Sequence, residues 1–199
     1  MPKINGSGQG SVFSRKELDK FFKVIKSENL YFYTLYKFLY FTGERSGCVI
    51  QVKWDDIDLT RDIIIFRDET RKGKYHRDPL DIHPELRQVL TDTIKAMRDK
   101  FGVADFVKME YVFYGLRDEG DHISRSHLDN SFKKHLLKCG FENKGFSLHS
   151  FRRTFVTRLY EVNKNVKECM TITGHKNVTH FMTYIQVNPE NIKEAIYSL

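Results

Sequence analysis

Cysteine is scarce in this 199-residue chain, and a long hydrophobic run is lacking altogether. The three cysteines, Cys48, Cys139 and Cys169, are odd in number, widely spaced and in no zinc-like pattern, which excludes a disulfide framework and predicts reduced, mostly buried thiols. The most apolar stretch, residues 30–41, contains Lys37 and is too short to span a membrane. A signal-peptide pattern is also lacking. We therefore expect a soluble protein of the cytoplasm.

Metal ligands at a suitable spacing, internal repeats and low-complexity tracts are lacking as well. His122, His127 and His135 have no partners at metal-ligand spacing, so a metal site is not expected. Acidic residues are fewer than basic ones: the chain has 26 Asp and Glu and 33 Lys and Arg, which gives a net charge of +7. A basic balance favours association with nucleic acid. Many basic proteins bind no specific partner, so charge alone does not decide the function.

The length is that of one domain with a single sizeable core. Residues 1–13 are rich in glycine and serine and show no apolar periodicity, so we expect a flexible leader or the remnant of an interdomain linker there. Ordered structure is expected to begin at Ser14, and residues 14–199 are expected to form the domain.

The apolar pattern predicts an α+β fold that is mostly helical, with one small antiparallel sheet. Ser14 and Glu17 form a capping-box pattern ahead of the first helix, and residues 30–41 are aromatic on nearly every side, as in a buried central helix. A β-branched run at residues 62–66, a basic turn at 70–74 and a shorter run ending at 79–80 predict a hairpin. Further helices are expected near residues 84–97, 124–139, 150–162, 166–171 and 189–199, and a brief extended segment at 111–114.

Several residues near the C-terminus have the chemistry to cut a phosphodiester without a metal, which needs a nucleophile, cations for the non-bridging oxygens and an acid for the leaving oxygen. His149 and Arg152 are three residues apart, so on a helix they face one site, where arginine can hold phosphate with two hydrogen bonds. His175 follows a Thr-Gly pair, where glycine permits a sharp turn. Tyr184 lies nine residues further on, and a tyrosine nucleophile needs a base or cationic surroundings. Singly, each is more often a solvated, turn or packing residue.

In combination these residues resemble the C-terminal signature of the tyrosine recombinase (phage integrase) family: His-x-x-Arg, then Gly-His, then Tyr nine residues later. The family's earlier arginine follows a Thr-Gly pair at a helix end and matches Arg45, which follows Thr-Gly-Glu. Its lysine lies in a hairpin turn shortly before a Pro-Leu pair and matches Lys72, ahead of Pro-Leu at 79–80. Residues 54–58 are also similar to the family, and the matches run in order from residue 42 to residue 184.

The resemblance implies the DNA breaking-rejoining enzyme fold and a site-specific DNA recombinase or integrase that needs no metal, nucleotide or other cofactor. The implied catalytic set is Arg45, Lys72, His149, Arg152, His175 and Tyr184. In it the tyrosine would attack the scissile phosphate, giving a 3′-phosphotyrosyl link and a free 5′-hydroxyl. The two arginines and the second histidine would bind the phosphate, the first histidine would assist proton transfer at the tyrosine, and the lysine would protonate the leaving oxygen. A hydroxyl from a partner strand would then reverse the step and rejoin DNA.

The resemblance also implies partners and a setting. The partner would be double-stranded DNA, on which the protein would assemble into a tetrameric synapse from monomers that are free in solution. The source would be a bacterium, an archaeon or a phage, and the protein would lie in the cytoplasm on the nucleoid. The target sequence stays open, as does the system served, which is a phage, a transposon or another mobile element, or a chromosome-dimer system.

Some features depart from the family pattern or stay open. Cys48 stands three positions after Arg45, where the family often has an acid, so that supporting contact is either lost or supplied elsewhere. Lys74 and Arg71 lie near enough in the turn to compete with Lys72. The family's N-terminal DNA-clamping domain is not found, which favours a catalytic fragment over a naturally short enzyme. The last helix would dock either on its own core or on a neighbouring protomer.

Two other functions are compatible with parts of the pattern. A type IB topoisomerase-like enzyme would use the same nucleophile to relax supercoils as a monomer, but the compact Thr-Gly-His motif and the small size disfavour it. A catalytically silent DNA-binding module is disfavoured because all six implied catalytic positions hold competent residues.

Overall fold

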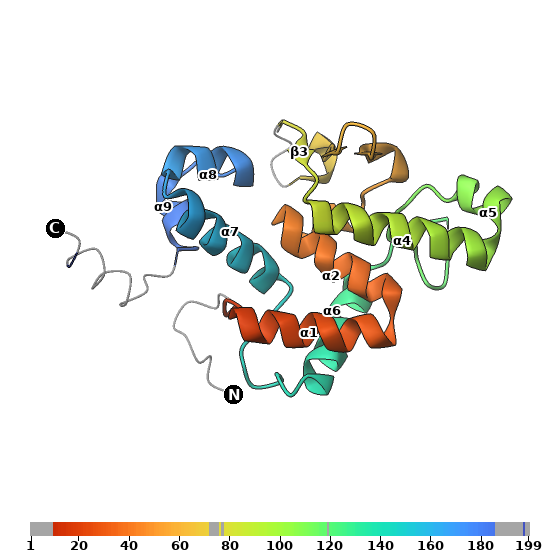
Figure 1. The fold of residues 1–199 in the computed structure, drawn as a ribbon, viewed down its shortest axis with the longest axis horizontal. Helices are drawn as coiled ribbons and strands as arrows, with labels where there is room; N and C mark the ends of the chain where they lie inside the picture. Colours follow the sequence, from red (N-terminus) through yellow and green to blue (C-terminus); the bar gives the residue numbers. More distant parts are fainter. Residues whose placement is uncertain (1–9, 72–75, 77, 119, 186–196, 198–199) are drawn as a thin grey trace.

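The structure is a computed structural model that describes residues 10–71, 76, 78–118, 120–185 and 197. Figure 1 shows helices arranged around a central helix, with a small sheet along one side. In chain order the elements are α1 (Arg15–Glu28), α2 (Leu30–Thr42), α3 (Ser46–Val49), the 3-10 turn η1 (Trp54–Asp56), β1 (Ile57–Asp58), β2 (Ile63–Ile64), η2 (Asp68–Thr70), β3 (Leu80–Asp81), α4 (Pro84–Phe101), α5 (Val103–Lys108), α6 (Arg125–Lys138), α7 (His149–Asn163), α8 (Val166–Thr173) and α9 (Val178–Met182).

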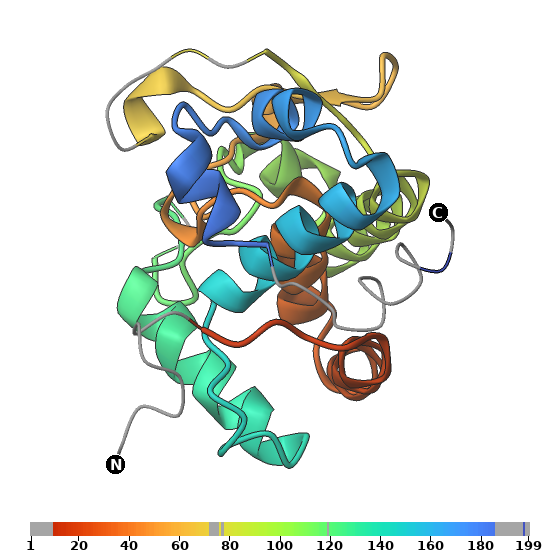
Figure 2. The same ribbon diagram turned by 90° about the vertical axis from the view of Figure 1, so that its left-hand side faces the viewer.

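The central helix is α2, which packs against α1, α4 and α7 (Figures 1 and 2). Most of its side chains are buried, so it forms the middle of the main core, as its aromatic sequence predicts. Lys37 is buried within it, where its ammonium group pairs with Glu85 at the start of α4 and lies 4.1 Å from the ring centre of Phe22. These contacts compensate for the burial of a charge.

The helix ends follow the capping signals in the sequence. Ser14 and Glu17 form the predicted capping box at the start of α1, and Pro84 lies in the first turn of α4. Helix α2 ends at Gly43, whose φ of 59° lies in the left-handed region that favours glycine. This turn directs the chain out of the core and toward the candidate site.

The predicted hairpin is present within a three-stranded antiparallel sheet of order β1-β2-β3. Ile63 of β2 lies opposite Asp58 on one side and Asp81 on the other. Strands β2 and β3 are the two arms of the predicted hairpin, and β1 is an additional strand after η1. The mostly helical α+β class is therefore confirmed. Residues 72–75 and 77 of the connecting turn lie outside the described residues.

Residues 10–13 correct the expectation that ordered structure begins at Ser14. Phe13 is 1% exposed and stacks on Phe146, with 3.9 Å between the ring centres. Its amide donates to Oγ1 of Thr154 in α7 at 3.0 Å. Burial of the large apolar surface of Phe13 stabilises this packing. The glycine-rich sequence before it gives no sign of such an anchor. Residues 1–9 and, except for residue 197, the helix expected at 189–199 lie outside the described residues.

Three further properties concern membranes, thiols and metal ligands. None of the described helices is long and apolar enough to cross a bilayer. Cys48, Cys139 and Cys169 are buried free thiols, as expected. Within the described part of the chain, no group of three side chains could hold a metal ion.

Candidate active site

The first turn of α7 presents His149 and Arg152 on one side of the helix, as their spacing predicts. Both approach Tyr184: the ring centres of His149 and Tyr184 are 5.3 Å apart, and the guanidinium carbon of Arg152 lies 5.8 Å from the tyrosine ring centre. Arg152 is 1% exposed. Its Nη1 donates to the carbonyl of Gly43 at 2.8 Å and its Nη2 to the carbonyl of Thr173 at 3.0 Å. The arginine therefore joins the end of α2 to the end of α8.

His175 is brought to the site by the turn that ends α8. Gly174 adopts a φ of 68°, which turns the chain back toward α7. The hydroxyl of Thr173 donates to the carbonyl of Cys169 at 2.7 Å, so Nδ1–H of His175 donates to that hydroxyl oxygen at 2.6 Å. Nε2 then accepts from Nη2 of Arg152 at 3.2 Å. The imidazole is thus held at both ring nitrogens.

Tyr184 follows α9, which packs with α7 and α8 through the fully buried Phe181 (Figure 2). The tyrosine ring lies between two histidine rings, with centres 5.3 Å from His149 and 4.9 Å from His175. Its backbone carbonyl accepts from Oγ1 of Thr157 in α7 at 2.8 Å. The short helix α9 therefore holds the tyrosine inside the site.

Arg45 is the residue that caps α3, two positions after the left-handed turn at Gly43. Its side chain is 37% exposed, so solvent reaches part of it. The preceding Glu44 is buried, and its Oε1 accepts from the Arg45 amide at 2.9 Å and lies 3.5 Å from Nη1 of Arg152. The carboxylate thus links the arginine after α2 with the arginine of α7.

The positive surroundings of His149 change its acidity. Burial, and then the charges of Arg152, Arg45 and Arg153, lower the pKa of His149 to about 4. The imidazole is therefore neutral at pH 7, the form in which one ring nitrogen can accept a proton. The site presents a neutral histidine next to a phenol and cationic guanidinium groups.

The basic turn is described only at its start. Lys72 and the competing Lys74 lie outside the described residues. Arg71 is 2% exposed, and its Nη2 lies 3.6 Å from Oε2 of Glu44. Its inward direction argues against Arg71 as the group that reaches a leaving oxygen.

Sequence reasoning missed two charged residues that shape this site, Glu44 and Arg153. Helical spacing predicts that Arg153 points away from the side of His149 and Arg152; it is buried, and it donates to the carbonyls of Gly10 at 2.7 Å and Thr183 at 3.4 Å. These partners are 143 and 30 positions away, so no local pattern indicates them. For Glu44 a signal was available in the sequence. The family often has an acid at the position of Cys48, so its absence there indicates that a nearby acid, such as Glu44, takes its place.

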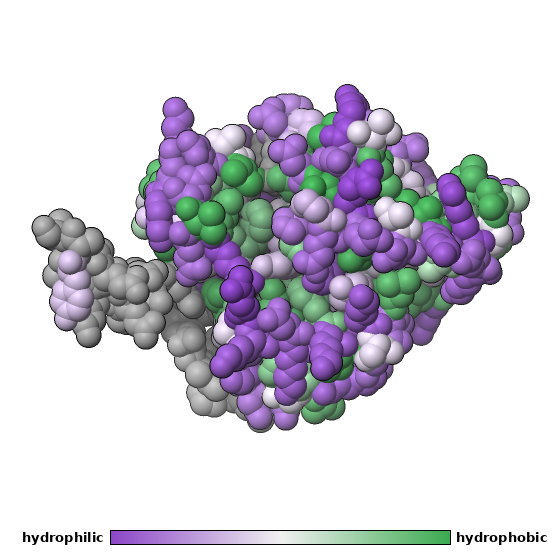
Figure 3. Space-filling view, viewed as in Figure 1, coloured by the Kyte–Doolittle hydropathy of each residue, from purple (hydrophilic) through white to green (hydrophobic). Residues whose placement is uncertain are grey.

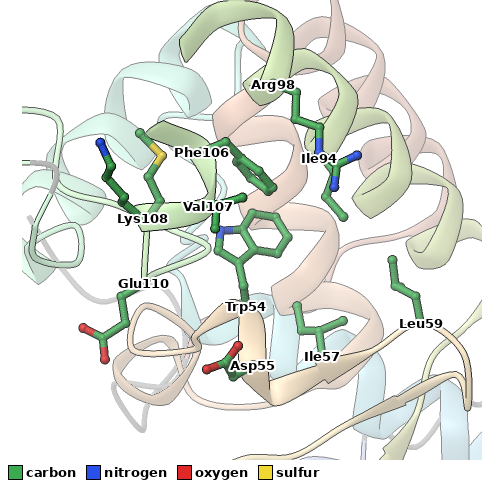
Figure 4. A pocket seen from close by; sticks show the side chains of 11 residues that line it. Trp54, Asp55, Ile57, Leu59, Ile94, Arg98, Phe106, Val107, Lys108 and Glu110 are labelled. Carbon is green, nitrogen blue, oxygen red and sulfur yellow. The ribbon is translucent and has the colours of Figure 1, made fainter. Parts of the chain in front are cut away.

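A surface pocket of about 560 Å³ lies around Trp54 and is lined by none of the predicted catalytic residues (Figure 4). Its apolar floor includes Phe106, whose ring centre is 5.5 Å from that of Trp54. Trp54 is therefore a packing residue. The cluster around Tyr184, and not this pocket, is the candidate active site.

The sequence pattern that describes the phage integrase family matches residues 11–191, nearly the whole chain. The chain belongs to the phage integrase family. Within the family it is similar to tyrosine recombinase XerA of Thermococcus kodakarensis, with 25% identity over 183 residues, and to tyrosine recombinase XerH of Campylobacter jejuni, with 21% identity over 187 residues. Each alignment covers 92% of this chain, 60% of XerA and 50% of XerH. The chain therefore spans about half the length of these relatives.

Solved structures of phage integrase family members share the fold. A crystal structure of XerA recombinase matches with a TM-score of 0.76 and 21% identity, over 96% of this chain and 65% of that chain. XerH bound to a palindromic difH substrate, in a post-cleavage complex, matches with a TM-score of 0.77 and 20% identity, over 98% of this chain and 55% of that chain. These matches cover nearly the whole chain, so the arrangement in Figure 1 is a fold that it shares with both recombinases.

Proposed function

We propose that the chain is the catalytic part of a site-specific DNA recombinase that cuts and rejoins DNA through a 3′-phosphotyrosyl intermediate. The observation that carries the proposal is the position of Tyr184, whose ring centre lies 5.3 Å from that of His149 and 4.9 Å from that of His175, with Arg152 alongside. A phenol among imidazole and guanidinium groups suits attack on a phosphate. Membership of the phage integrase family and its tyrosine recombinase relatives support the same reaction.

In the proposed step, Oη of Tyr184 attacks phosphorus and the bond from phosphorus to the 5′ oxygen breaks. The phenolic proton passes to the neutral imidazole of His149, and the bound phosphate assists by raising the pKa of that histidine. Lys72 gives a proton to the departing 5′ oxygen. Nothing is oxidised or reduced, and attack by a 5′-hydroxyl on the phosphotyrosine runs the same step backwards.

The negative charge that develops on the phosphate is assigned to Arg45, Arg152 and His175. Arg152 suits this role because its guanidinium is already held by the carbonyls of Gly43 and Thr173, so it loses little freedom when phosphate arrives. Arg45 suits it because its side chain is partly exposed.

We also propose the wider setting. Residues 14–199, with 10–13 packed onto them, act as the catalytic domain of a recombinase on double-stranded DNA. Four copies form a synapse on DNA from monomers in solution; a lambda integrase of the same fold was solved as a tetramer bound to a Holliday junction, with a TM-score of 0.69. The substrate site and the mobile element or chromosome served follow from the DNA that the protein selects.

The test is covalent trapping from a library of DNA duplexes, which does not require the target sequence to be chosen in advance. The protein is incubated, with a chelator present, with duplexes that carry a randomised segment and one nick, so that a short 5′-hydroxyl fragment diffuses away after attack. We expect an adduct that survives denaturation, with DNA attached to Tyr184 by peptide mass, and sequencing of the trapped DNA gives the site.

Two variants control the trapping experiment. Tyr184→Phe should form no adduct, whereas Tyr160→Phe, which removes a hydroxyl further along α7, should trap DNA like the wild type. If no duplex of the library is trapped, or if Tyr184→Phe still forms the adduct, the proposed function is wrong.

A further inference from the structure

One buried carboxylate, that of Glu44, lies among three arginines. Its Oε1 is 3.5 Å from Nη1 of Arg152 and 3.9 Å from Nη1 of Arg45, and its Oε2 is 3.6 Å from Nη2 of Arg71. The side chains of Glu44, Arg71 and Arg152 are at most 1% exposed. The carboxylate is therefore inside the protein, between the end of α2, the first turn of α7 and the start of the basic turn.

Burial makes these contacts consequential. A carboxylate removed from water is costly unless cations and hydrogen bonds compensate for the lost hydration. Three guanidinium groups and the Arg45 amide, which donates to Oε1 at 2.9 Å, supply that compensation. In return, the carboxylate favours one direction for the buried guanidinium groups of Arg71 and Arg152, because a buried ion pair is tightest in one geometry. It also lies 3.9 Å from Nη1 of the partly exposed Arg45.

The neighbouring Cys48 does not supply a negative charge. Burial, and then the charge of Glu44, raise the pKa of the Cys48 thiol to about 11, so it stays protonated at pH 7. Its Sγ donates to the carbonyl of Thr70 at 3.1 Å. Cys48 and Glu44 thus both contact the chain at residues 70–71. Cys48 does so through a neutral hydrogen bond, and Glu44 through an ion pair with Arg71.

We propose that Glu44 is a positioning residue for the strand-cleavage reaction proposed above, on which this inference rests. It supplies, from the position before Arg45, the acid that is missing at position 48. It holds Arg45 and Arg152 in the direction that phosphate requires, and through Arg71 it fixes the point where the lysine-bearing turn begins. Glu44 itself touches no DNA, because a carboxylate would repel phosphate.

The inference is tested with Glu44→Gln, which keeps the shape and removes the charge, and with Glu44→Asp, which keeps the charge on a shorter stem. Asp56→Asn is the matched control, since Asp56 is also buried and pairs with an arginine, Arg67 at 2.7 Å, outside the site. Thermal unfolding and DNA affinity are measured for each variant, so that rates are compared only for folded protein saturated with DNA.

The decisive readout is strand cleavage of the duplex that the wild type selects, compared with the same duplex carrying a methylphosphonate at the scissile position. The methyl group replaces one charged oxygen, so this substrate needs correctly directed arginines less. We expect Glu44→Gln to cleave the phosphodiester about 10²-fold more slowly than the wild type, the loss typical of a small misplacement of catalytic groups. We expect roughly a tenth of that deficit on the methylphosphonate, because less charge is left to stabilise.

Glu44→Asp should show a smaller deficit with the same substrate dependence, and it decides the question if Glu44→Gln does not fold. Asp56→Asn should cleave both substrates like the wild type. Cleavage by the Glu44 variants at the wild-type rate, or with an equal deficit on both substrates, overturns the inference and leaves the proposed function standing. If the wild type cleaves no duplex, the proposed function is wrong and the inference falls with it.

Discussion

Arg152 is fixed by the protein before any phosphate is present. Two of its nitrogens donate to the carbonyls of Gly43 and Thr173, and one of these also donates to His175. Directing such a group in advance is the usual source of electrostatic catalysis, because no reorganisation is needed when charge develops. Replacement of Arg152 would therefore disturb three segments of the chain as well as the proposed phosphate contact.

His149 gives a pH prediction at the level of one residue. Its pKa is about 4 in the folded protein because of burial and the neighbouring arginines, whereas an unfolded histidine has a pKa near 6.5. Between these values the unfolded chain binds more protons, so the stability that depends on His149 rises with pH through this window and is lost as pH falls from about 6.5 toward 4.

The measurement is chemical unfolding at several pH values, together with an NMR titration of the imidazole. Wild type should lose more stability than His149→Asn between pH 6.5 and 4, and the imidazole midpoint should lie near 4 in the free protein. A midpoint near the unperturbed 6.5 would mean that neither burial nor the arginine charges lower the pKa of this imidazole.

The sequence predicts most of the side chains that meet at Tyr184 but not how they are held. His149 and Arg152 are found together because three positions along a helix select one face. His175 and Tyr184 meet across α9, and only the resemblance to a family indicates that. The pairing of Glu44 with Arg152 joins residues far apart in the chain, and such pairing depends on the packing of α2 against α7.

Among the elements, the end of α2 is held tightly against α7. Gly43 has a left-handed φ of 59°, and a Cβ there would overlap the ring of Phe155. Gly140, after α6, has a similar φ of 68° but no neighbouring atom near its Cβ direction. Alanine at Gly140 would therefore introduce backbone strain alone, whereas alanine at Gly43 would introduce strain together with steric overlap.

We expect Gly140→Ala to lower the free energy of unfolding by about 1 kcal/mol, the cost of a left-handed alanine. Gly43→Ala should cost about 3 kcal/mol because overlap adds to strain. It should also slow DNA cleavage, since the Gly43 carbonyl accepts from Arg152. Urea unfolding and the trapping assay check both effects, and equal losses for the two variants would contradict the packing of Phe155 described above.

The longer helices and the hairpin are predictable from the sequence because capping residues and apolar periodicity act locally. The helices that escape prediction are α3, α5 and α9, which have four, six and five residues. Helices this short are not stable alone, so their formation depends on tertiary packing. For α9 that packing is Phe181, which is fully buried against α7 and α8.

The whole molecule carries a net charge of +7, and its surface mixes polar with apolar regions. Figure 3 shows hydrophobic surface over α5 at the far end from α8 and α9, where Val103 and Val107 are exposed.

Binding of duplex DNA to this positively charged protein should weaken steeply as salt increases, because each neutralised phosphate releases counterions.

We expect Arg45→Gln to reduce the slope of log affinity against log salt by about one, the value for the loss of one phosphate contact. Lys108→Gln is the control, because Lys108 pairs with Asp105 on α5, away from the candidate site. Fluorescence anisotropy over a range of salt concentrations gives both slopes. An unchanged slope for Arg45→Gln would remove Arg45 from the phosphate contacts.

The contacts of Arg153 also have a mechanical meaning. One guanidinium bonds to the backbone of Gly10 and to the backbone of Thr183, the residue before Tyr184. A single buried side chain therefore contacts both the backbone at residue 10 and the backbone next to the proposed nucleophile. A change in the position of residue 10 is therefore expected to shift Arg153 and, with it, the backbone next to the tyrosine that would cut DNA.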